Sequence, residues 1–359
     1  MMLLDSYSNL KIFHHAEALD AISHNEHRAP LYVRLKPTNI CNHHCSYCTY
    51  GSGGTTQKTE NRDEINHRDS IPWPKMQEIL HDMGEMGVRA LTFSGGGEPL
   101  CYPYITEAAH LACEQGLQLS LISNGQLLAD ERADAFYTAK WVRISFDSPF
   151  PETYCRLRGL TDDAFRVVTQ NIENFAKKKN KDCVLGINFV VSKDNATQVY
   201  ETAHLLKELG VDNVKFSAVV KNVPHYHWEI KDNVIEQIHL ARTDFADNKF
   251  SIVNNYENDW KDKNFETQPF PVCYTCRLVT VIAADQRVYF CHTRAYDSKA
   301  IVGDVRKQSF KDMWYSEETV NRLEKLKPMQ DCHNFCVYQD RNQLIEAYLD
   351  VDLKHIDFL

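Results

Sequence analysis

The chain has 359 residues, of which 43% are hydrophobic and 25% are charged, a normal globular mixture. Its formal net charge of −9 argues against nucleic acid as a partner, because phosphates need a basic face, and against an anionic membrane surface. No apolar run approaches the roughly 20 residues of a membrane span, and the N-terminal sequence lacks the marks of a signal peptide. We therefore expect a cytoplasmic protein, in which most of the twelve cysteines are better explained by metal binding than by disulfide bonds.

Strands and helices are predicted to alternate along most of the chain. Short apolar runs typical of strands covered on both faces lie at 31–36, 89–95, 117–125, 141–147, 183–192 and 212–220. Segments with helical spacing lie at 73–87, 104–116, 127–138, 163–179, 196–210 and 232–248. Repeated βαβ units predict an α/β fold with a parallel sheet, open or curved into a barrel, and place its chemistry at the C-terminal ends of the strands.

The pattern changes after about residue 220, where a second group of cysteines and a β-hairpin follow the last predicted helix. We therefore predict four parts. They are an N-terminal extension (1–29), a barrel domain (30–225), a connecting helix and linker (226–259) and a small α+β cluster-binding domain with the hairpin (260–359).

The first cysteine group lies in the loop after the first predicted strand. In the segment NICNHHCSYCTYGSGG, Cys41, Cys45 and Cys48 have the spacing C-x3-C-x2-C. Three thiolates do not close a tetrahedral zinc site, although His43 or His44 could supply a fourth ligand. Iron–sulfur clusters normally take four thiolates, so a cluster held by three keeps one iron open for a substrate or cofactor. The spacing favours this second interpretation.

A glycine-rich turn, FSGGGEP, follows the second predicted strand. Glycine at 95–97 lets the backbone approach a ligand closely. Glu98 adds a carboxylate that could take an ammonium group. Such a turn is weak evidence by itself, but beside a three-cysteine loop on the neighbouring strand it is strong evidence for a cofactor site.

On these residues the chain resembles the radical S-adenosylmethionine (SAM) superfamily over about residues 30–220. Besides the cysteine motif with Tyr47 before its last cysteine and the GGEP turn, the segments ISNG (122–125) and RISFD (143–147) also match. The resemblance implies a partial (β/α)6 barrel, similar to a TIM barrel. It also implies that the three cysteines hold a [4Fe–4S] cluster whose open iron binds S-adenosylmethionine.

The resemblance implies how this cofactor is bound and used. Candidate cofactor-binding residues are Tyr47, Gly95, Gly96, Gly97, Glu98, Ser123, Asn124, Ser145, Arg158 and Arg166. The turn and Glu98 would hold the amino group, and the serines with one of the two arginines would meet the carboxylate or ribose. One electron from a flavodoxin- or ferredoxin-type donor, passed through the cluster, would cleave the cofactor to methionine and a 5′-deoxyadenosyl radical. That radical would abstract hydrogen from an unactivated C–H bond of the substrate.

The second cysteine group resembles the auxiliary-cluster domains called SPASM and twitch, although Gln286 stands where their hairpin usually has glycine. Its candidate ligands are Cys273, Cys276, Cys291, Cys332 and Cys336, with the first two competing for one position. Five cysteines are fewer than two clusters need by comparison with that family, so we expect one auxiliary [4Fe–4S] cluster. A zinc knuckle is the alternative, because C-x2-C suits zinc equally well.

An auxiliary cluster favours oxidation, because it can accept the electron that a substrate radical must lose. We therefore expect an oxidoreductase acting on a small polar substrate such as a sugar, an aminocyclitol or a nucleotide-linked sugar. A loop past the sixth strand, with His225, Tyr226 and His227, is a candidate for substrate contacts.

Three alternatives remain open. An epimerase would need a cysteine hydrogen donor, for which Cys101 and Cys155 are the candidates, whereas Cys113 is expected to be a small core residue. A peptide-modifying enzyme often has an N-terminal leader-binding module, for which the 40 residues before Cys41 are few. The most distant alternative is a non-catalytic iron–sulfur or zinc protein.

Overall fold

The computed structural model describes residues 8–51, 65–161, 163–220, 225–259, 268–332, 336–352 and 354. Within these residues a single ten-stranded sheet forms the centre, in the order β10-β9-β8-β1-β2-β3-β4-β5-β6-β7. Its strands are β1 (Tyr32–Leu35), β2 (Ala90–Phe93), β3 (Gln118–Ser123), β4 (Trp141–Ser145), β5 (Val184–Val191), β6 (Asn213–Ala218), β7 (Ser251–Asn254), β8 (Val279–Ile282), β9 (Arg287–Tyr289) and β10 (Ile301–Asp304).

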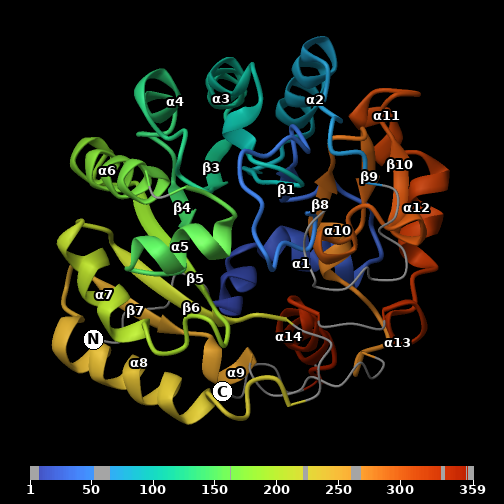
Figure 1. The fold of residues 1–359 in the computed structure, drawn as a ribbon. Coiled ribbons are helices and arrows are strands. Elements are labelled where there is room, and N and C mark those ends of the chain that lie inside the picture. Colours follow the sequence, from blue (N-terminus) through green and yellow to red (C-terminus); the bar gives the residue numbers. More distant parts are fainter. Residues whose placement is uncertain are drawn as a thin grey trace.

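Strands β1 to β6 are parallel neighbours in chain order, each connected to the next through one or more helices. These helices are α2 (Trp73–Met86), η2 (Pro99–Cys101), α3 (Ile105–Glu114), α4 (Asp130–Asp134), α5 (Pro151–Arg158), α6 (Asp163–Lys178) and α7 (Val199–Glu208). Figure 1 shows α2, α3, α4, α6 and α7 on the outside of the curved sheet. The predicted α/β fold with a partial parallel barrel is confirmed.

The ends of these helices follow local sequence signals. Proline occupies the first turn of α2 and of α5, where its missing N–H would have no intrahelical partner. Gly87 and Gly159 end the same two helices with φ of +76° and +63°, a left-handed conformation that glycine adopts without steric cost.

Two features of the sheet lie outside the sequence prediction. Strand β7 pairs parallel with β6, within the segment 226–259 that was expected to be only a helix and a linker. Strand β8 pairs parallel with β1, so the C-terminal hairpin of β8 and β9 continues the barrel sheet. Helices α8 (Lys231–Phe245) and α9 (Tyr256–Asp259) flank β7 in the chain.

The remaining helices belong to the two ends of the chain. They are η1 (Asn9–His14), α1 (Ala16–Ser23), α10 (Thr275–Leu278), η3 (His292–Arg294), η4 (Ser298–Ala300), α11 (Phe310–Trp314), α12 (Glu317–Glu324), α13 (Pro328–Asp331) and α14 (Gln339–Leu349). The two ends pack together, since the rings of Phe13 and Tyr348 lie 5.7 Å apart. No helix in the described part of the chain is long and apolar enough to cross a membrane.

Side chains alternate between the two faces of each barrel strand. In β1, Val33 and Leu35 are fully buried in the main apolar core, and in β4, Val142 and Ile144 are buried in the same way. The residues between them face the other side of the sheet. That other side is the interior of the barrel, called the lumen below, and it contains polar side chains such as Arg34.

Candidate active site

The first three cysteines lie on the loop that leaves the C-terminal end of β1. The backbone N–H groups of His44 and Ser46 donate to the carbonyl oxygens of Arg158 and Leu157, both over 2.9 Å, and tie the loop to the end of α5. Cys41 is exposed, Cys45 and Cys48 are half-buried, and all three are free thiols. A short, anchored loop with three reduced thiols matches the soft ligands that iron–sulfur clusters require.

A buried ion pair lies against this loop. The guanidinium of Arg158 donates to the sulfur of Cys45 over 3.7 Å and forms an ion pair with the carboxylate of Asp147. The hydroxyl of Tyr47 donates to the same carboxylate, whose other oxygen accepts the backbone N–H of Val190 at 2.9 Å. Burial lowers the pKa of Arg158, but Asp147, Tyr47 and Cys45 together raise it by more, so the guanidinium stays charged.

Replacing Asp147 with alanine is expected to cost about 3–5 kcal/mol of unfolding free energy, because Arg158 would keep a buried charge without its partner. Denaturant unfolding under anaerobic conditions measures this loss. The control is Asp194→Ala, which removes the exposed partner of Arg156 and should cost at most about 1 kcal/mol. Equal losses in the two variants would contradict the supporting role of the buried pair.

The glycine turn lies against the chain that leads into the cysteine loop. The N–H of Gly97 donates to the carbonyl of Thr38 at 3.1 Å, and that of Glu98 to the carbonyl of Ile40 at 2.9 Å. A Cβ atom on Gly97 would lie 2.2 Å from the carbonyl oxygen of Ile40, closer than any real side chain allows. The ammonium of Lys36, itself buried, donates to the carbonyl of Gly95 at 2.6 Å.

Glu98 is buried at this turn and its carboxylate has three donors. They are the Ser123 hydroxyl and the Asn124 backbone N–H, both at 2.7 Å, and the Leu100 backbone N–H at 3.1 Å. Burial raises the pKa of Glu98, and these donors act in the opposite direction. A carboxylate offers about four acceptor positions, so about one remains for a further donor. In this structure Ser123 and Asn124 hold Glu98 and thereby the turn.

An amide network connects the cysteine loop to the end of β3. The amide of Asn124 donates to Asn42 at 2.7 Å, and the amide of Asn42 donates to Gln126 at 3.1 Å. The Nε2 atom of His43 lies 2.7 Å from the same Gln126 oxygen, and burial lowers the pKa of His43 to about 3. His43 is therefore neutral and its Nε2 atom is used within the protein. The thiol of Cys101 lies at the edge of this network, 3.8 Å from the Asn42 oxygen.

Several predicted site residues lie elsewhere. Arg166 is 76% exposed on α6, where it faces Asp163 at 3.9 Å, so of the two arginines only Arg158 lies beside the cysteine loop. Ser145 is half-buried at the end of β4. Cys155 is buried and its thiol donates to the Thr161 carbonyl at 2.9 Å.

The described part of the loop after β6 holds the three candidates for substrate contacts, His225, Tyr226 and His227. His227 is buried and its Nε2 atom lies 2.9 Å from the Val219 carbonyl oxygen. Tyr226 accepts the backbone N–H of Lys193 at 3.2 Å, and His225 has a φ of +59°. The prediction that Cys113 belongs to the core is wrong, because α3 turns this residue to the solvent.

The second cysteine group lies at the opposite end of the same strands. Strand β8 runs parallel to β1, so Cys273 and Cys276, which precede β8, lie near the N-terminal end of β1. Strand β9 runs antiparallel to β8, so Cys291, which follows β9, returns to that end as well. The Cys41 loop, by contrast, leaves the C-terminal end of β1. The hydroxyl of Tyr50, two residues after Cys48, reaches the carbonyl of His292 at 3.3 Å.

The C-terminal thiols influence one another. Burial raises the pKa of Cys332 to about 12, and neighbouring Cys273, Cys291 and Cys336 contribute to the rise. The buried thiol of Cys276 donates to the backbone oxygen of Cys273 at 2.9 Å, and a hydrogen bond from Cys276 is the main cause that raises the pKa of the Cys273 thiol. No three histidine, cysteine or acidic side chains of the described segments converge as the ligands of a single metal ion would.

A tyrosine that the sequence analysis did not single out joins the C-terminal part to the glycine turn. Tyr296 is buried, has a φ of +68° and donates its hydroxyl to Asn39, 257 residues earlier in the chain. A Cβ atom on Gly96 would lie 2.4 Å from this hydroxyl. The C-terminal part therefore closes directly over the turn. No local pattern marks a contact over this separation.

Comparison with known proteins agrees with this geometry. Residues 35–223 match the Radical SAM superfamily, and residues 260–336 match the SPASM iron–sulfur cluster-binding domain. The chain is 24% identical to the AdoMet-dependent heme synthase of Methanosarcina barkeri, over 87% of this chain and 89% of that protein. It is also 24% identical to the tungsten-containing aldehyde ferredoxin oxidoreductase cofactor-modifying protein of Pyrococcus furiosus, over 80% and 81%.

A solved structure shows the same fold. SuiB of Streptococcus suis bound to S-adenosylmethionine superposes with a TM-score of 0.63 and 16% identity, covering 93% of this chain and 80% of SuiB. The family match spans more than half of the chain and contains both the cysteine loop and the glycine turn. The chain therefore belongs to the radical SAM superfamily, as an enzyme with a C-terminal SPASM domain whose cofactors are S-adenosylmethionine, a [4Fe–4S] cluster and an auxiliary cluster.

Proposed function

We propose that this enzyme is an oxidoreductase that removes two hydrogens from a small polar organic substrate. The observation that carries the proposal is the position of the two cysteine groups, at opposite ends of the β1–β8 pair. A substrate bound in the lumen would have the radical source at one end and the electron acceptor at the other. Hydrogen abstraction and electron removal could then occur from opposite sides of one bound molecule.

The residues at the C-terminal end of β1 fit the first cluster and its cofactor. Cys41, Cys45 and Cys48 would hold the cluster, and the glycine turn with Glu98 would face the amino group of S-adenosylmethionine. Bound there, the cluster and S-adenosylmethionine together supply the carbon-centred radical that takes a hydrogen atom from the substrate. The protein's own contribution is to position the reacting groups and to exclude water.

Arg158 and Asp147 have a supporting role in this proposal. The N–H of Arg158 that points to the Cys45 sulfur favours the thiolate form that binds iron. Asp147 fixes the guanidinium, and Tyr47 fixes Asp147, so the three side chains hold the middle of the cysteine loop. We therefore assign Arg158 and Tyr47 to the support of the cluster rather than to direct contact with the cofactor.

Cys273, Cys291, Cys332 and Cys336 are the proposed ligands of the auxiliary cluster. Four thiolates complete a cluster and leave no open iron, which suits a centre that only accepts electrons. The amide of Asn342 donates to the sulfur of Cys273 over 3.7 Å, and hydrogen bonds to sulfur are among the factors that set the potential of such a cluster.

In the proposed oxidation the substrate would lose one hydrogen atom to the radical, one electron to the auxiliary cluster and one proton to solvent. The product has lost two hydrogen atoms and gained one double bond. The electron leaves through a flavodoxin- or ferredoxin-type protein, the same class of partner that reduces the first cluster.

Two other reactions have a specific observation in their favour. Peptide modification is supported by the PqqA peptide cyclase of Gluconobacter oxydans, which is 25% identical over 56% of this chain. Epimerisation needs a hydrogen donor, and Cys101 is half-buried beside the amide network of the cysteine loop. Cys155 is a weaker candidate, because its thiol is buried within α5 and bonded to the Thr161 carbonyl.

The double variant Cys332→Ala with Cys336→Ala tests the proposed oxidation. It should keep about half of the iron, because each four-iron cluster has its own ligands. It should still form 5′-deoxyadenosine after reduction, but it should not convert the substrate, which mass spectrometry detects as the loss of two hydrogen atoms. Wild-type protein incubated anaerobically with candidate substrates provides the reference.

The matched control is Cys276→Ala, which removes a thiol of the same region that we do not assign to the cluster. It should retain iron, cofactor cleavage and product formation. Full product formation by the double variant would show that the C-terminal cluster is not the electron acceptor. Incorporation of solvent deuterium into a substrate of unchanged composition would show that the enzyme catalyses epimerisation and not oxidation.

A further inference from the structure

A cavity opens into the barrel lumen from the N-terminal side of the strands. Its volume is about 620 Å³, enough for a small organic molecule. Residues of the inner face of the sheet line it, among them Tyr32 on β1, Ser120 on β3 and Trp141 with Arg143 on β4. Residues from η1 and α14, including Arg341, complete its wall.

The charges around this cavity are all positive. Lys11, Lys140, Arg143 and Arg341 line it, and no aspartate or glutamate is among its described lining residues. The chain as a whole has 49 acidic and 40 basic residues, so a wall with only cations is not what its composition predicts. Lys140 and Arg341 form no ion pair within the described segments, so their positive charge is not neutralised by the protein there.

A half-buried arginine extends this positive region into the lumen. Arg34 lies on β1 two residues beyond Tyr32, on the same face of the strand, and its Nε atom is buried without a hydrogen-bond partner. The tyrosines Tyr32, Tyr338 and Tyr50 influence its charge, and Tyr338 also forms a hydrogen bond with it. The ring of Tyr338 also lies under the guanidinium of Arg341, 5.4 Å from ring centre to charge. The buried Nε donor of Arg34 is the part of this side chain that a bound acceptor would satisfy.

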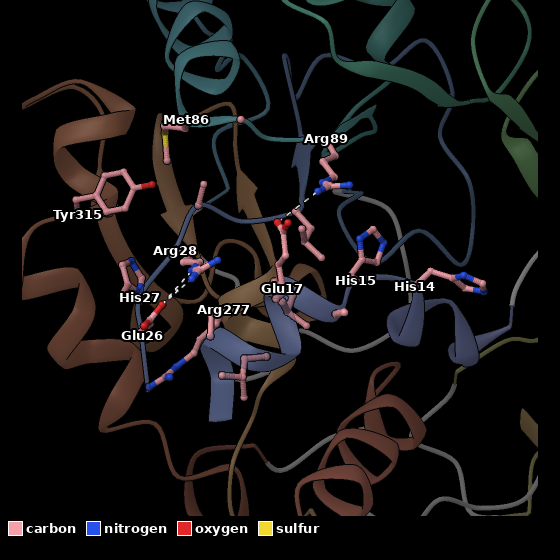
Figure 2. Close-up of a pocket in the computed structure, with 18 residues that line it drawn as sticks. His14, His15, Glu17, Glu26, His27, Arg28, Met86, Arg89, Arg277 and Tyr315 are labelled. Carbon is pink, nitrogen blue, oxygen red and sulfur yellow. Dashed lines mark hydrogen bonds and ion pairs between the residues drawn. The ribbon is translucent and has the colours of Figure 1, made fainter. Parts of the chain in front are cut away.

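A second cavity of the same part of the molecule gives a comparison (Figure 2). It has a volume of about 540 Å³ and is lined by residues of α1 and the C-terminal end of α2. Its arginines have acidic partners: Arg28 lies 2.8 Å from Glu26, and Arg89 lies 4.0 Å from Glu17. The protein therefore pairs Arg28 and Arg89 with acidic groups, whereas Lys140 and Arg341 of the lumen-side cavity have no acidic partner in the described segments.

We propose that the cavity lined by Arg143 and Arg341 binds an anionic group, a carboxylate or a phosphate, of the substrate. This inference rests on the proposed function and adds the substrate class to it. An arginine guanidinium binds either oxyanion through paired N–H donors, and it does so more strongly where water is partly excluded. Arg34 would receive the group deeper in the lumen. The guanidinium of Arg143 lies over the ring of Trp141, 5.1 Å from its centre. The remainder of the substrate would extend towards the cysteine loop.

The test is calorimetric titration of the reconstituted holoenzyme with two anions, propane-1,2,3-tricarboxylate and inorganic phosphate. Glycerol serves as the uncharged counterpart of the tricarboxylate. Wild-type enzyme should bind at least one anion and not glycerol. Arg143→Gln and Arg341→Gln should each weaken that binding about tenfold, the loss expected for one hydrogen bond to a charged group. Arg34→Gln should do the same if it folds, which its iron content and circular dichroism establish.

The matched control is Arg156→Gln, an exposed arginine on α5 that pairs with Asp194 outside the cavity. It should bind the anions as the wild-type enzyme does. Tricarboxylate binding identifies a carboxylate group, and phosphate binding identifies a phosphate group. No binding of either anion, or binding that is the same in all variants, would overturn the proposal. The failure of the proposed oxidation would be seen separately, as a substrate that takes up solvent deuterium without losing two hydrogen atoms.

Discussion

Replacing Cys45 with alanine is expected to remove about half of the iron from the enzyme and to abolish cleavage of S-adenosylmethionine. Two four-iron clusters give about eight irons per chain in the wild-type enzyme, and only one of them depends on the loop after β1. Cys45 is the middle thiol of that loop and the one that Arg158 contacts. Its loss leaves two thiolates for the cluster and also leaves the N–H of Arg158 without its sulfur acceptor.

Iron analysis after anaerobic reconstitution, together with chromatographic measurement of 5′-deoxyadenosine after reduction, checks both parts of this result. Cys113→Ala is the control, since this cysteine is exposed on α3 and lies outside both cysteine groups. The control should retain all of the iron and all of the cleavage. Stoichiometric zinc in place of iron in the wild-type protein would be incompatible with the assignment.

Replacing Gly97 with alanine should abolish cofactor cleavage by a different route. The new Cβ atom would lie 2.2 Å from the carbonyl oxygen of Ile40 and 2.4 Å from the carbonyl carbon of Asn39. Both are backbone atoms, which cannot rotate away as a side chain can. The turn must therefore separate from the chain that enters the cysteine loop, and the hydrogen bonds of Gly97 to Thr38 and of Glu98 to Ile40 would be lost.

Equilibrium binding of S-adenosylmethionine to the reconstituted enzyme distinguishes this effect from the loss of the cluster. The variant should lose more than about tenfold in affinity, the equivalent of 1.4 kcal/mol, while keeping the iron bound by the C-terminal cysteines. Gly84→Ala in α2 is the control. Its Cβ atom would meet the mobile end of the Gln115 side chain at 2.7 Å, and alanine is favoured over glycine inside a helix by about 1 kcal/mol. Unchanged affinity in the Gly97 variant would show that the turn does not touch the cofactor.

The barrel and the first cysteine group could be predicted because their signals are local. The six apolar runs correspond to β1–β6, and parallel strands covered by helices produce such runs without information from distant residues. Cys41, Cys45 and Cys48 lie within eight residues, so their spacing alone restricts the metal centre they can form. The segment RISFD included Asp147, but nothing in it indicated that this carboxylate pairs with Arg158.

The boundary of the barrel was less predictable. A strand of four residues such as β7 or β8 gives a weak signal, and its partner is chosen by tertiary contacts. The sequence correctly indicated the hairpin, but it did not indicate that β8 would pair with β1. This pairing brings the second cysteine group to the end of the lumen, so it determines the geometry on which the proposed oxidation depends.

The amino-acid sequence by itself determined the fold class, the family and the spacing of the first three cysteines, because each depends on residues that are close together in the chain. Only the tertiary structure decided which groups from distant segments meet: Arg158 with Asp147, Tyr296 with Asn39, and the cations of η1, β4 and α14 around one cavity. The physical reason is that burial, charge pairing and the proximity of thiols depend on how the chain packs. The segments that pack together are far apart in the sequence, and local sequence patterns do not indicate which of them will be in contact.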